Sequence, residues 1–482
     1  MTIINLVQRV TRWPSAQSIC IYRQALATFA SSLLSLAGGI TFGYTAVLLP
    51  QLENDASFPY DKNYDSWIAS ISPLAMMMGC VFSGTMSDAL GRKTGMLILI
   101  FPYSIGWIVM AFANNNIIIL LGRFITGICT GAVRPLTMVY IGELTSPKYR
   151  AITLFCPSMA IHVGSFMSHT IGKYMYWKNS CYIFILPNIV CVLILLCLKE
   201  SPLWLITKGK SKEGIESFKF FRGDGEESEK ELALVLDKFG ENAEKATFKD
   251  TLDILFSKPF FMSLMTILVL FIAVQWCGVN TLSFYAQMIF EKTFSGDVDA
   301  FMLMLVTDGI RMIAAMFVCI FARYLPRKVT FLCCSYGTAF LLIGLVIYLF
   351  MKPVGLVALA VAIIVIYIAL ASVLTCISWS FVAEIFPARV RGFGSGLSSC
   401  MSFALLFGSV QVAPSIIASF GEAVMYGVFA IVTFISAIIL SFILPETNGK
   451  SLQEIENSLY DKKKENKNDV PLDLKPSDPT QA

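Results

Sequence analysis

Acidic and basic residues recur in pairs at the ends of long apolar stretches of this chain. The pairs are Asp88 with Arg92, Glu143 with Arg150, and Glu384 with Arg391, and two more carboxylates, Glu200 and Glu446, follow other stretches. Carboxylates and guanidiniums placed in this way can form charge-assisted hydrogen bonds between neighbouring helices. We expect a reversible latch, which movement of the helices would break. The alternative is that these residues only solvate helix ends and set the orientation of the chain.

Four further charged residues lie inside apolar stretches, and a charge there is costly unless it marks a pathway or a pair. They are Arg123, Arg134, Asp308 and Arg311. Asp308 and Arg311 are three residues apart and can pair on one helical face. The alternatives are a role in substrate polarity or in proton coupling. Arg134 shares a helical face with Arg123 and is expected to lie deep.

The overall composition of the chain is that of a membrane protein. Of 482 residues, 56% are apolar and 15% are charged, and the mean hydropathy is +0.68. Soluble domains carry about 25% charged residues, so we exclude cytosolic enzymes, secreted disulfide scaffolds and nucleic-acid binders. The two His and 13 Cys form no metal-ligand pattern, so we expect neither a metal nor a cofactor.

Apolar runs predict an all-α integral membrane protein with twelve transmembrane helices. The expected spans are 25–50, 67–87, 95–113, 117–140, 152–174, 180–198, 260–290, 299–322, 328–350, 354–383, 393–419 and 423–444. The expected domains are a cytoplasmic arm (1–24), a six-helix bundle (25–198), a helical cytoplasmic linker (199–258), a second bundle (259–444) and a cytoplasmic tail (445–482).

Lys and Arg are unequally divided between the two sides of the predicted bundle. Nearly all of those outside the spans fall on the side that carries both termini and the linker; the exceptions are Lys62, Lys173, Lys178, Lys292 and Lys352. Positive residues concentrate on the cytoplasmic side. Both termini are therefore predicted to be cytoplasmic, in a multi-pass protein of the plasma membrane.

The two predicted bundles repeat the same charge signatures at a nearly constant offset. Glu143 and Arg150 correspond to Glu384 and Arg391, Arg92-Lys93 to Arg327-Lys328, Glu200 to Glu446, and Phe42-Gly-Tyr44 to Phe284-Tyr285. This order predicts two six-helix pseudo-repeats in parallel orientation. Such repeats are associated with alternating access to a site at the repeat interface.

Several motifs resemble the signatures of the sugar porter branch of the major facilitator superfamily. They are Asp88-Ala-Leu-Gly-Arg-Lys93, Gly122-Arg-Phe-Ile-Thr-Gly127, Glu200-Ser-Pro-Leu-Trp204, Gln275-Trp-Cys-Gly-Val-Asn280, Glu384-Ile-Phe-Pro387 and Pro445-Glu-Thr-Asn-Gly449. The match covers nearly the whole chain. Within that branch the chain looks most like the insect facilitated trehalose and hexose transporters.

The resemblance implies a set of substrate-binding residues. Gln275 and Asn280 match the sugar-contacting amides of the family, Trp379 matches the tryptophan that stacks on the sugar, and Phe284-Tyr285 matches an aromatic pair of the outer gate. Ser158 stands where the family has a glutamine, and His162, one helical turn away, could line the same cavity. Interhelical hydrogen bonding is the alternative for the amides and for His162.

The chain departs from the family at several positions. The first glutamine of the amide pair is Val274, and two family asparagines fall on Met312 and Ser402. Arg123 matches a family arginine whose acidic partner, in proton-coupled members, follows a Gly-Tyr; here that position is Thr45. Without a titratable partner, Arg123 cannot couple protonation to movement in that way, which favours facilitated diffusion.

These observations predict a facilitative transporter of a hexose or trehalose, and not an enzyme. The alternatives are a proton-coupled symporter that uses Asp308, with Arg123 and Arg311 as further coupling candidates, and a non-transporting sugar receptor. The expected partners are a small sugar and membrane lipids, without nucleic acid, and the protein is expected to function as a monomer.

Overall fold

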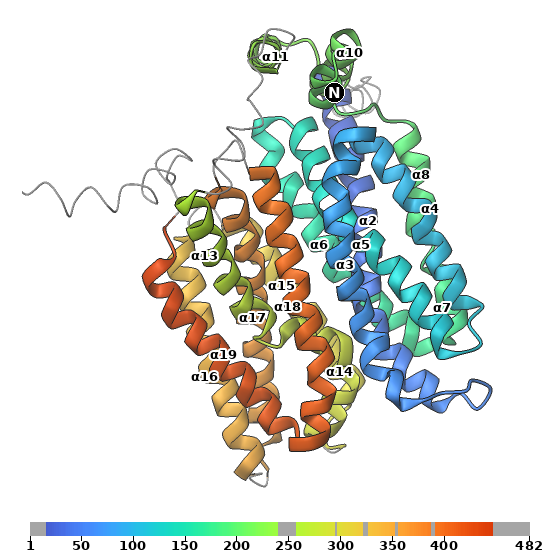
Figure 1. The fold of residues 1–482 in the computed structure, drawn as a ribbon, viewed down its shortest axis with the longest axis vertical. Coiled ribbons are helices and arrows are strands. Elements are labelled where there is room, and N and C mark those ends of the chain that lie inside the picture. The colour runs from blue at the N-terminus through green and yellow to red at the C-terminus, as the bar shows by residue number, and fades with distance from the viewer. Residues whose placement is uncertain are drawn as a thin grey trace, which may run out of the picture.

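The computed structural model describes residues 16–239, 257–294, 296–321, 326–351, 355–386 and 391–446. Within these ranges the chain is helical, and twelve segments are long and apolar enough to cross a membrane. The predicted all-α architecture is therefore confirmed. The helices form two bundles that stand side by side, each built from one half of the sequence (Figure 1).

The first half contains six spans in chain order. They are α2 (Ala16–Asn54), α3 (Asp65–Leu90), α4 (Arg92–Ala111), α5 (Asn116–Leu144), α6 (Pro147–Tyr174), and α7 (Trp177–Ile183) followed by α8 (Leu186–Leu196). A short 3₁₀ turn, η1 (Lys62–Tyr64), precedes α3. Helix α2 begins inside the expected N-terminal arm, so the first span extends further than the sequence predicted.

The second half repeats this arrangement with one span in two pieces. Its helices are α13 (Lys258–Gln275) and α14 (Val279–Phe294), then α15 (Ala300–Phe321), α16 (Arg327–Met351), α17 (Val357–Ile385), α18 (Arg391–Phe420) and α19 (Glu422–Ile443). The span expected at 260–290 is present as Phe260–Phe294, but its backbone leaves the helical conformation after Gln275.

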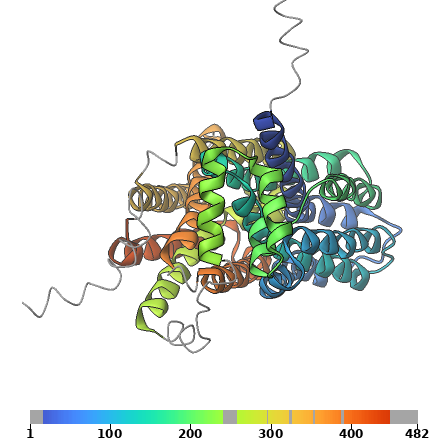
Figure 2. The ribbon, with the colours of Figure 1, turned by 90° about the horizontal axis from the view of Figure 1, so that it is seen from above.

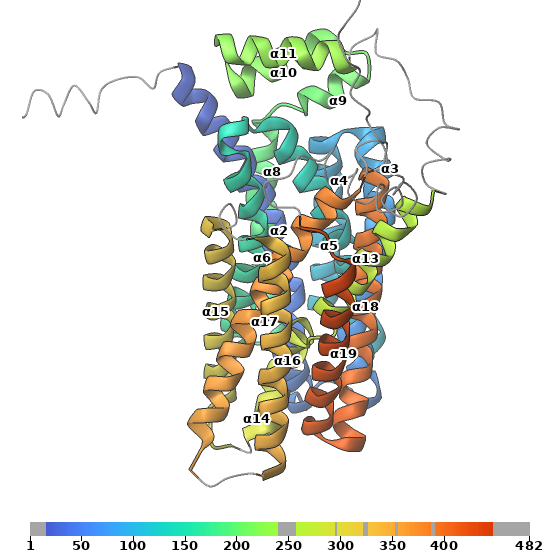
Figure 3. The same ribbon diagram turned by 90° about the vertical axis from the view of Figure 1, so that its left-hand side faces the viewer.

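Three short helices form a layer across one end of the bundle, called here the linker end; the opposite end is the far end. They are α9 (Pro202–Thr207), α10 (Ser211–Arg222) and α11 (Glu226–Phe239) (Figures 2 and 3). The layer is bound to the first half. Gln24 Nε2 donates to Phe221 O at 2.8 Å, and Arg222 Nη2 donates to Thr145 O at 2.9 Å.

The helices of the first half approach each other at glycines. A Cβ added to Gly131 would lie 2.0 Å from Met76 O, and one added to Gly39 would lie 1.9 Å from Ile161 O. Small residues allow backbones in membranes to pack this closely. Not every glycine marks such a contact, since a Cβ on Gly309 of the second half would meet no atom within 4 Å.

Equivalent carboxylates, Glu200 and Glu446, cap the N-terminus of the third span of each half, which is α4 in the first half and α16 in the second. Glu200 Oε1 accepts hydrogen bonds from the backbone N–H groups of Arg92 at 2.9 Å and Lys93 at 2.8 Å. Glu446 accepts from the N–H groups of Arg327 at 3.0 Å and Lys328 at 3.1 Å. A carboxylate at a helix N-terminus satisfies N–H groups that the helix leaves unpaired. The internal repeat seen in the sequence thus has the same local geometry in both halves.

Side-chain contacts between the two halves are concentrated toward the far end. Helix α3 packs along α18, α2 along α14, and α6 along α15. The rings of Phe42 and Phe284 meet edge to face with centroids 5.6 Å apart. Ser70 hydrogen bonds to Gln411 across the same interface. These contacts close the space between the halves at the far end.

Candidate functional site

The break between α13 and α14 positions two amide side chains at mid-membrane. Gly278 adopts a positive φ of 87°, and a Cβ there would lie 2.4 Å from the Phe429 ring. The carbonyl of Cys277 accepts a hydrogen bond from Tyr367 OH at 2.7 Å. Irregular backbone inside a membrane requires such a partner. The break brings Gln275 and Asn280 together, although five residues separate them in sequence.

A cavity of about 80 Å³ lies between the two halves at this break. From the first half it is lined by Phe42, Arg134, Phe155, Ser158, Ile161, His162 and Ser165; from the second by Gln275, Asn280, Ser283, Arg311, Thr375, Cys376, Trp379, Phe403 and Leu406. Five residues expected to bind substrate are therefore together here: Gln275, Asn280, Trp379, Ser158 and His162.

The other two expected residues, Phe284 and Tyr285, do not line the cavity. Phe284 is buried, and its ring contacts Phe42. Tyr285 has non-helical backbone dihedrals, and its hydroxyl donates to Val410 O at 3.2 Å. Phe284 and Tyr285 therefore lie outside the wall of the cavity, where they help to close the space between the halves.

The two amides belong to one chain of hydrogen bonds. Gln275 Nε2 donates to Ser402 Oγ at 2.7 Å, and Asn280 Nδ2 donates to Gln275 Oε1 at 2.8 Å. Arg311 Nη2 then donates to Asn280 Oδ1 at 3.2 Å. Arg311 also contacts Ser283 Oγ. The sequence interpretation treated Ser402 as a lost site residue, but it holds the Gln275 amide in place.

An ion pair between Asp308 and Arg311, one of the sequence expectations, is wrong. Asp308 Oδ2 lies 2.5 Å from His169 Nδ1, which belongs to the first half. Both side chains are buried. Helical spacing could not reveal this partner because it comes from α6. Asp308 therefore joins the two halves, and Arg311 is left with neutral partners.

Arg134 is a cavity residue; the sequence indicates that it lies deep and could favour a polar or acidic substrate, but does not place it among the sugar-contacting residues. Its guanidinium lies 3.8 Å above the ring of Trp379, whose ring also contacts Phe271 with centroids 5.0 Å apart. Arg134 makes no side-chain hydrogen bond or ion pair with any residue that the structure describes. The depth of this arginine in an apolar span was the available signal.

The cation–π contact does not offset the cost of placing this charge in the membrane. Such a contact contributes about 2 kcal/mol when it is shielded from water, whereas removing an ion from water costs several kcal/mol. The cavity therefore holds an incompletely compensated positive charge at Arg134. It also holds Arg311, and its lining contains no Asp or Glu.

Arg123, by contrast, has a complete set of neutral acceptors away from the cavity. Its guanidinium donates to Thr41 O at 2.8 Å, to Thr45 Oγ1 at 2.5 Å and to Ile68 O at 3.2 Å. These bonds join α2, α3 and α5. The side chain is fully buried, so its place is structural within the first half.

The predicted latch residues of the first half bond to each other within that half. Arg92 pairs with Glu143 at 3.1 Å and with Asp88 at 3.2 Å. Arg150 donates to Thr145 O at 3.3 Å, so the expected partner of Glu143 is replaced by Arg92. Ser201 of the linker also contacts Glu143. In the described chain these bonds fasten the linker layer to α3, α4 and α5.

The side chains of the other latch pair, Glu384 and Arg391, lie outside the described residues. Glu446 is described and caps α16, as noted above. Of the latch residues expected in the second half, Glu446 is therefore the one whose side-chain contacts the structure describes.

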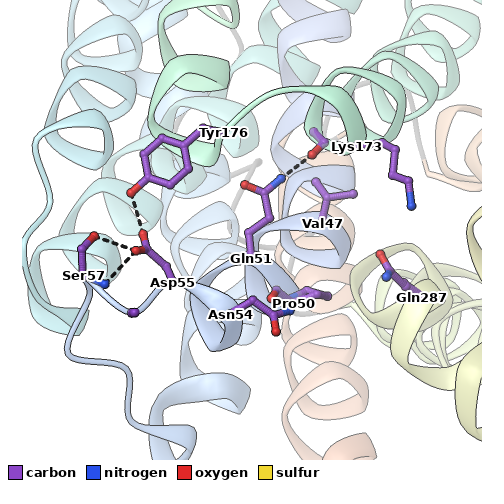
Figure 4. A pocket seen from close by; sticks show the side chains of 11 residues that line it. Val47, Pro50, Gln51, Asn54, Asp55, Ser57, Lys173, Tyr176 and Gln287 are labelled. Carbon is purple, nitrogen blue, oxygen red and sulfur yellow. Dashed lines mark hydrogen bonds between the residues drawn. The ribbon is translucent and has the colours of Figure 1, made fainter.

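A second, more open cavity of about 600 Å³ lies at the far end. Asp55 accepts hydrogen bonds from Ser57 Oγ at 2.6 Å and Tyr176 OH at 2.5 Å in the wall of this cavity (Figure 4). It also accepts one from Trp177 Nε1 at 3.1 Å. These hydrogen bonds hold the pKa of the Asp55 carboxyl well below its usual range, and the bond from Ser57 contributes most. Gln287 of α14 faces the same space from the second half.

Known proteins resemble this chain over most of its length. Residues 27–459 match the family model described as "Sugar (and other) transporter". Facilitated trehalose transporter Tret1 of Bombyx mori is 29% identical over 459 residues, which is 92% of this chain and 88% of that protein. Tret1 of Polypedilum vanderplanki is 27% identical over 454 residues, or 92% and 90% of the two chains.

Solved structures share the fold. The proton:xylose symporter XylE of the major facilitator superfamily superposes with a TM-score of 0.72 at 18% identity, covering 90% of this chain and 100% of that one. A partially occluded, inward-open form of XylE from E. coli gives 0.72 at 16% identity, covering 89% and 100%. With a family match along nearly all its length, the chain belongs to the family described as "Sugar (and other) transporter", and it has the fold of the XylE structures.

Proposed function

We propose that this protein is a facilitative transporter that moves a hexose or trehalose across the plasma membrane by alternating access. The observation that carries the proposal is the central cavity. Both halves contribute to it, and its amides and hydroxyls are groups that can bind a polyhydroxylated ring. A site at the interface of two pseudo-repeats is reached from one side or the other as the repeats rock.

The contacts between the halves favour a conformer that is closed at the far end. Phe42 and Phe284 meet there, His169 bonds to Asp308, and Ser70 bonds to Gln411. The clustering of Lys and Arg supports a cytoplasmic location for the linker end. Under that orientation the far end is the outer side, and the transporter is closed to the outside in this conformer.

Facilitated transport is favoured over proton coupling by the surroundings of Arg123. Its acceptors are two backbone carbonyls and the Thr45 hydroxyl, none of which titrates in the physiological range. The trehalose transporters among the relatives are named as facilitated carriers. A carrier of this kind equilibrates its solute and cannot concentrate it.

Net uptake by purified protein in liposomes tests the proposal. We expect downhill entry of at least one sugar from a panel of mono- and disaccharides, without accumulation when an inward pH gradient is imposed. Accumulation that Asp308→Asn abolished would instead establish a symporter. A protein that bound a sugar but moved none of the panel would contradict the transport function and would support the receptor alternative.

A matched pair of amide variants tests the site. Asn280→Ala removes the acceptor of Arg311 and the donor to Gln275, so it should lower the rate of uptake. Asn179→Ala removes an exposed amide from α7 and should leave uptake unchanged. Equal uptake by both variants would show that the central cavity is not the binding site.

A further inference from the structure

We propose that the central cavity prefers sugars that carry an oxyanion, a carboxylate or a phosphate, over neutral sugars. The inference rests on the proposed alternating-access function and specifies only the class of solute. It is carried by two arginines that face the cavity from opposite halves, Arg134 on α5 and Arg311 on α15.

The charge balance of the cavity is positive. No Asp or Glu is among its lining residues. Asp308 lies one helical turn before Arg311, but its carboxylate is bound to His169. Even when Asp308 is counted with its full charge and His169 is neutral, the two guanidiniums exceed it by one charge. An anionic solute would supply the missing counter-charge.

The guanidiniums also have donors to spare. Arg134 donates to no described residue, so its planar set of N–H groups is free for a ligand. Arg311 bonds only to the neutral acceptors Asn280 and Ser283 among the described residues, and its buried Nε has no partner. Arginine presents paired donors that match the two oxygens of a carboxylate or phosphate.

The same geometry disfavours a neutral ring at Trp379. An indole face can hold the apolar side of a sugar, but the guanidinium of Arg134 already lies 3.8 Å above this one, and Phe271 contacts the ring as well. A neutral sugar would have to displace Arg134 and leave its charge unpaired. An anionic sugar can bind to that guanidinium directly.

Hydroxyl-binding groups distinguish a sugar from a simple inorganic anion. Ser158 lines the cavity and has no described hydrogen-bond partner. Thr375 donates to Ala371 O at 2.9 Å, which leaves its oxygen able to accept from a ligand hydroxyl. His162 adds a ring nitrogen to the same wall. The cavity therefore combines a place for an oxyanion with places for hydroxyl groups.

Exchange by the full-length protein in proteoliposomes tests the preference. The three probes are D-glucose, D-glucuronate and glucose 6-phosphate, which share one ring and differ at carbon 6. We expect at least one acid to exchange roughly tenfold faster than glucose, as charge-assisted bonds require. Its uptake should also increase when the interior is made positive, since the transported solute is charged. The two acids separate a carboxylate from a phosphate preference.

Charge variants locate the preference. Arg134→Gln should lower the ratio of acid to glucose exchange about tenfold, and Arg134→Lys should restore part of it because lysine keeps the charge but not the paired donors. Lys292→Gln removes an exposed positive charge from α14 outside the cavity and should leave the ratio unchanged. Thermal stabilisation of the unmodified protein in detergent by each probe gives an independent measure of binding.

The outcomes separate the two hypotheses. Exchange of glucose with neither acid exchanged nor stabilising would overturn the preference and leave the carrier function intact. A ratio that Lys292→Gln lowers as much as Arg134→Gln would also overturn it, because the effect would then be one of overall charge. Failure of all three probes to exchange or to stabilise the protein would overturn the preference, whereas the carrier function fails only if the panel of mono- and disaccharides is not transported either.

Discussion

Phe42 and Phe284 come from matching motifs of the two pseudo-repeats, and their rings meet across the interface with centroids 5.6 Å apart and planes at 63°. Phe42 lies on α2, the first span of the first half, and Phe284 lies on α14, the second piece of the first span of the second half. The contact lies directly beside the central cavity, which Phe42 also lines. Closure at the far end therefore involves matching motifs from the two halves.

Loss of this contact should favour a conformer that is open at the far end. An aromatic pair contributes about 0.5–1.5 kcal/mol beyond its burial, so Phe284→Ala should raise the open population about fivefold. Distances between spin labels at the far ends of α2 and α14 would measure the shift. Phe340→Ala, on an exposed face of α16, is the control. An unchanged distance distribution in Phe284→Ala would show that other contacts hold the far end shut.

The caps of the third helices should be stabilising. Glu200→Ala deprives the N–H groups of Arg92, Lys93 and Thr94 of their acceptor. Loss of a cap costs about 0.5–2 kcal/mol, which should appear as a lower unfolding midpoint in chemical denaturation. Glu216→Ala removes only an exposed salt bridge to Lys199, where the cost is about 0–1 kcal/mol. A larger effect for Glu216 than for Glu200 would contradict the capping role.

Glycine substitutions should affect the two halves differently. Gly131→Ala would force a Cβ to within 2.0 Å of Met76 O, and such overpacking costs about 1–3 kcal/mol. Gly309→Ala enters open space within α15 and should be neutral or stabilise by up to about 1 kcal/mol. Unfolding midpoints of the two variants in detergent provide the comparison. Equal destabilisation would mean that the contact at Gly131 relaxes without cost.

The far-end wall should weaken in acid. Hydrogen bonds from Ser57, Tyr176 and Trp177 lower the pKa of Asp55, so its contribution is complete above the ordinary carboxyl pKa of about 3.9. The contribution is lost as the pH falls through the lowered value. Asp55→Asn should be less stable than the unmodified protein at neutral pH, with a smaller further loss below about pH 4. Parallel pH profiles of the unfolding midpoint would refute this.

The sequence was sufficient for the spans because a membrane accepts only backbones that satisfy their own hydrogen bonds. Twelve apolar runs therefore translate directly into twelve spans. The repeat was visible because charges at helix ends, such as Glu200 and Glu446, keep their order in both halves. The grouping of Gln275, Asn280 and Trp379 was an implication of family resemblance, and the cavity contains all three.

Partners across the two halves could not be read from spacing. Asp308 was assigned to Arg311 because they share a helical face, but its partner His169 is on α6. The sequence indicated that Arg134 lies deep, but its contact with the Trp379 ring depends on where the two halves place α5 and α17. Such contacts depend on the relative position of two bundles, which a local sequence pattern does not encode.

The interruption at Gly278 has a consequence for movement. The Tyr367 hydroxyl satisfies the carbonyl of Cys277 at the interruption, so no helical hydrogen bond has to be broken there for the chain to bend. The interruption can therefore act as a hinge about which α13 and α14 tilt independently. A tilt of α14 alone would then separate the two halves at the far end, while α13 keeps Gln275 hydrogen bonded to Ser402.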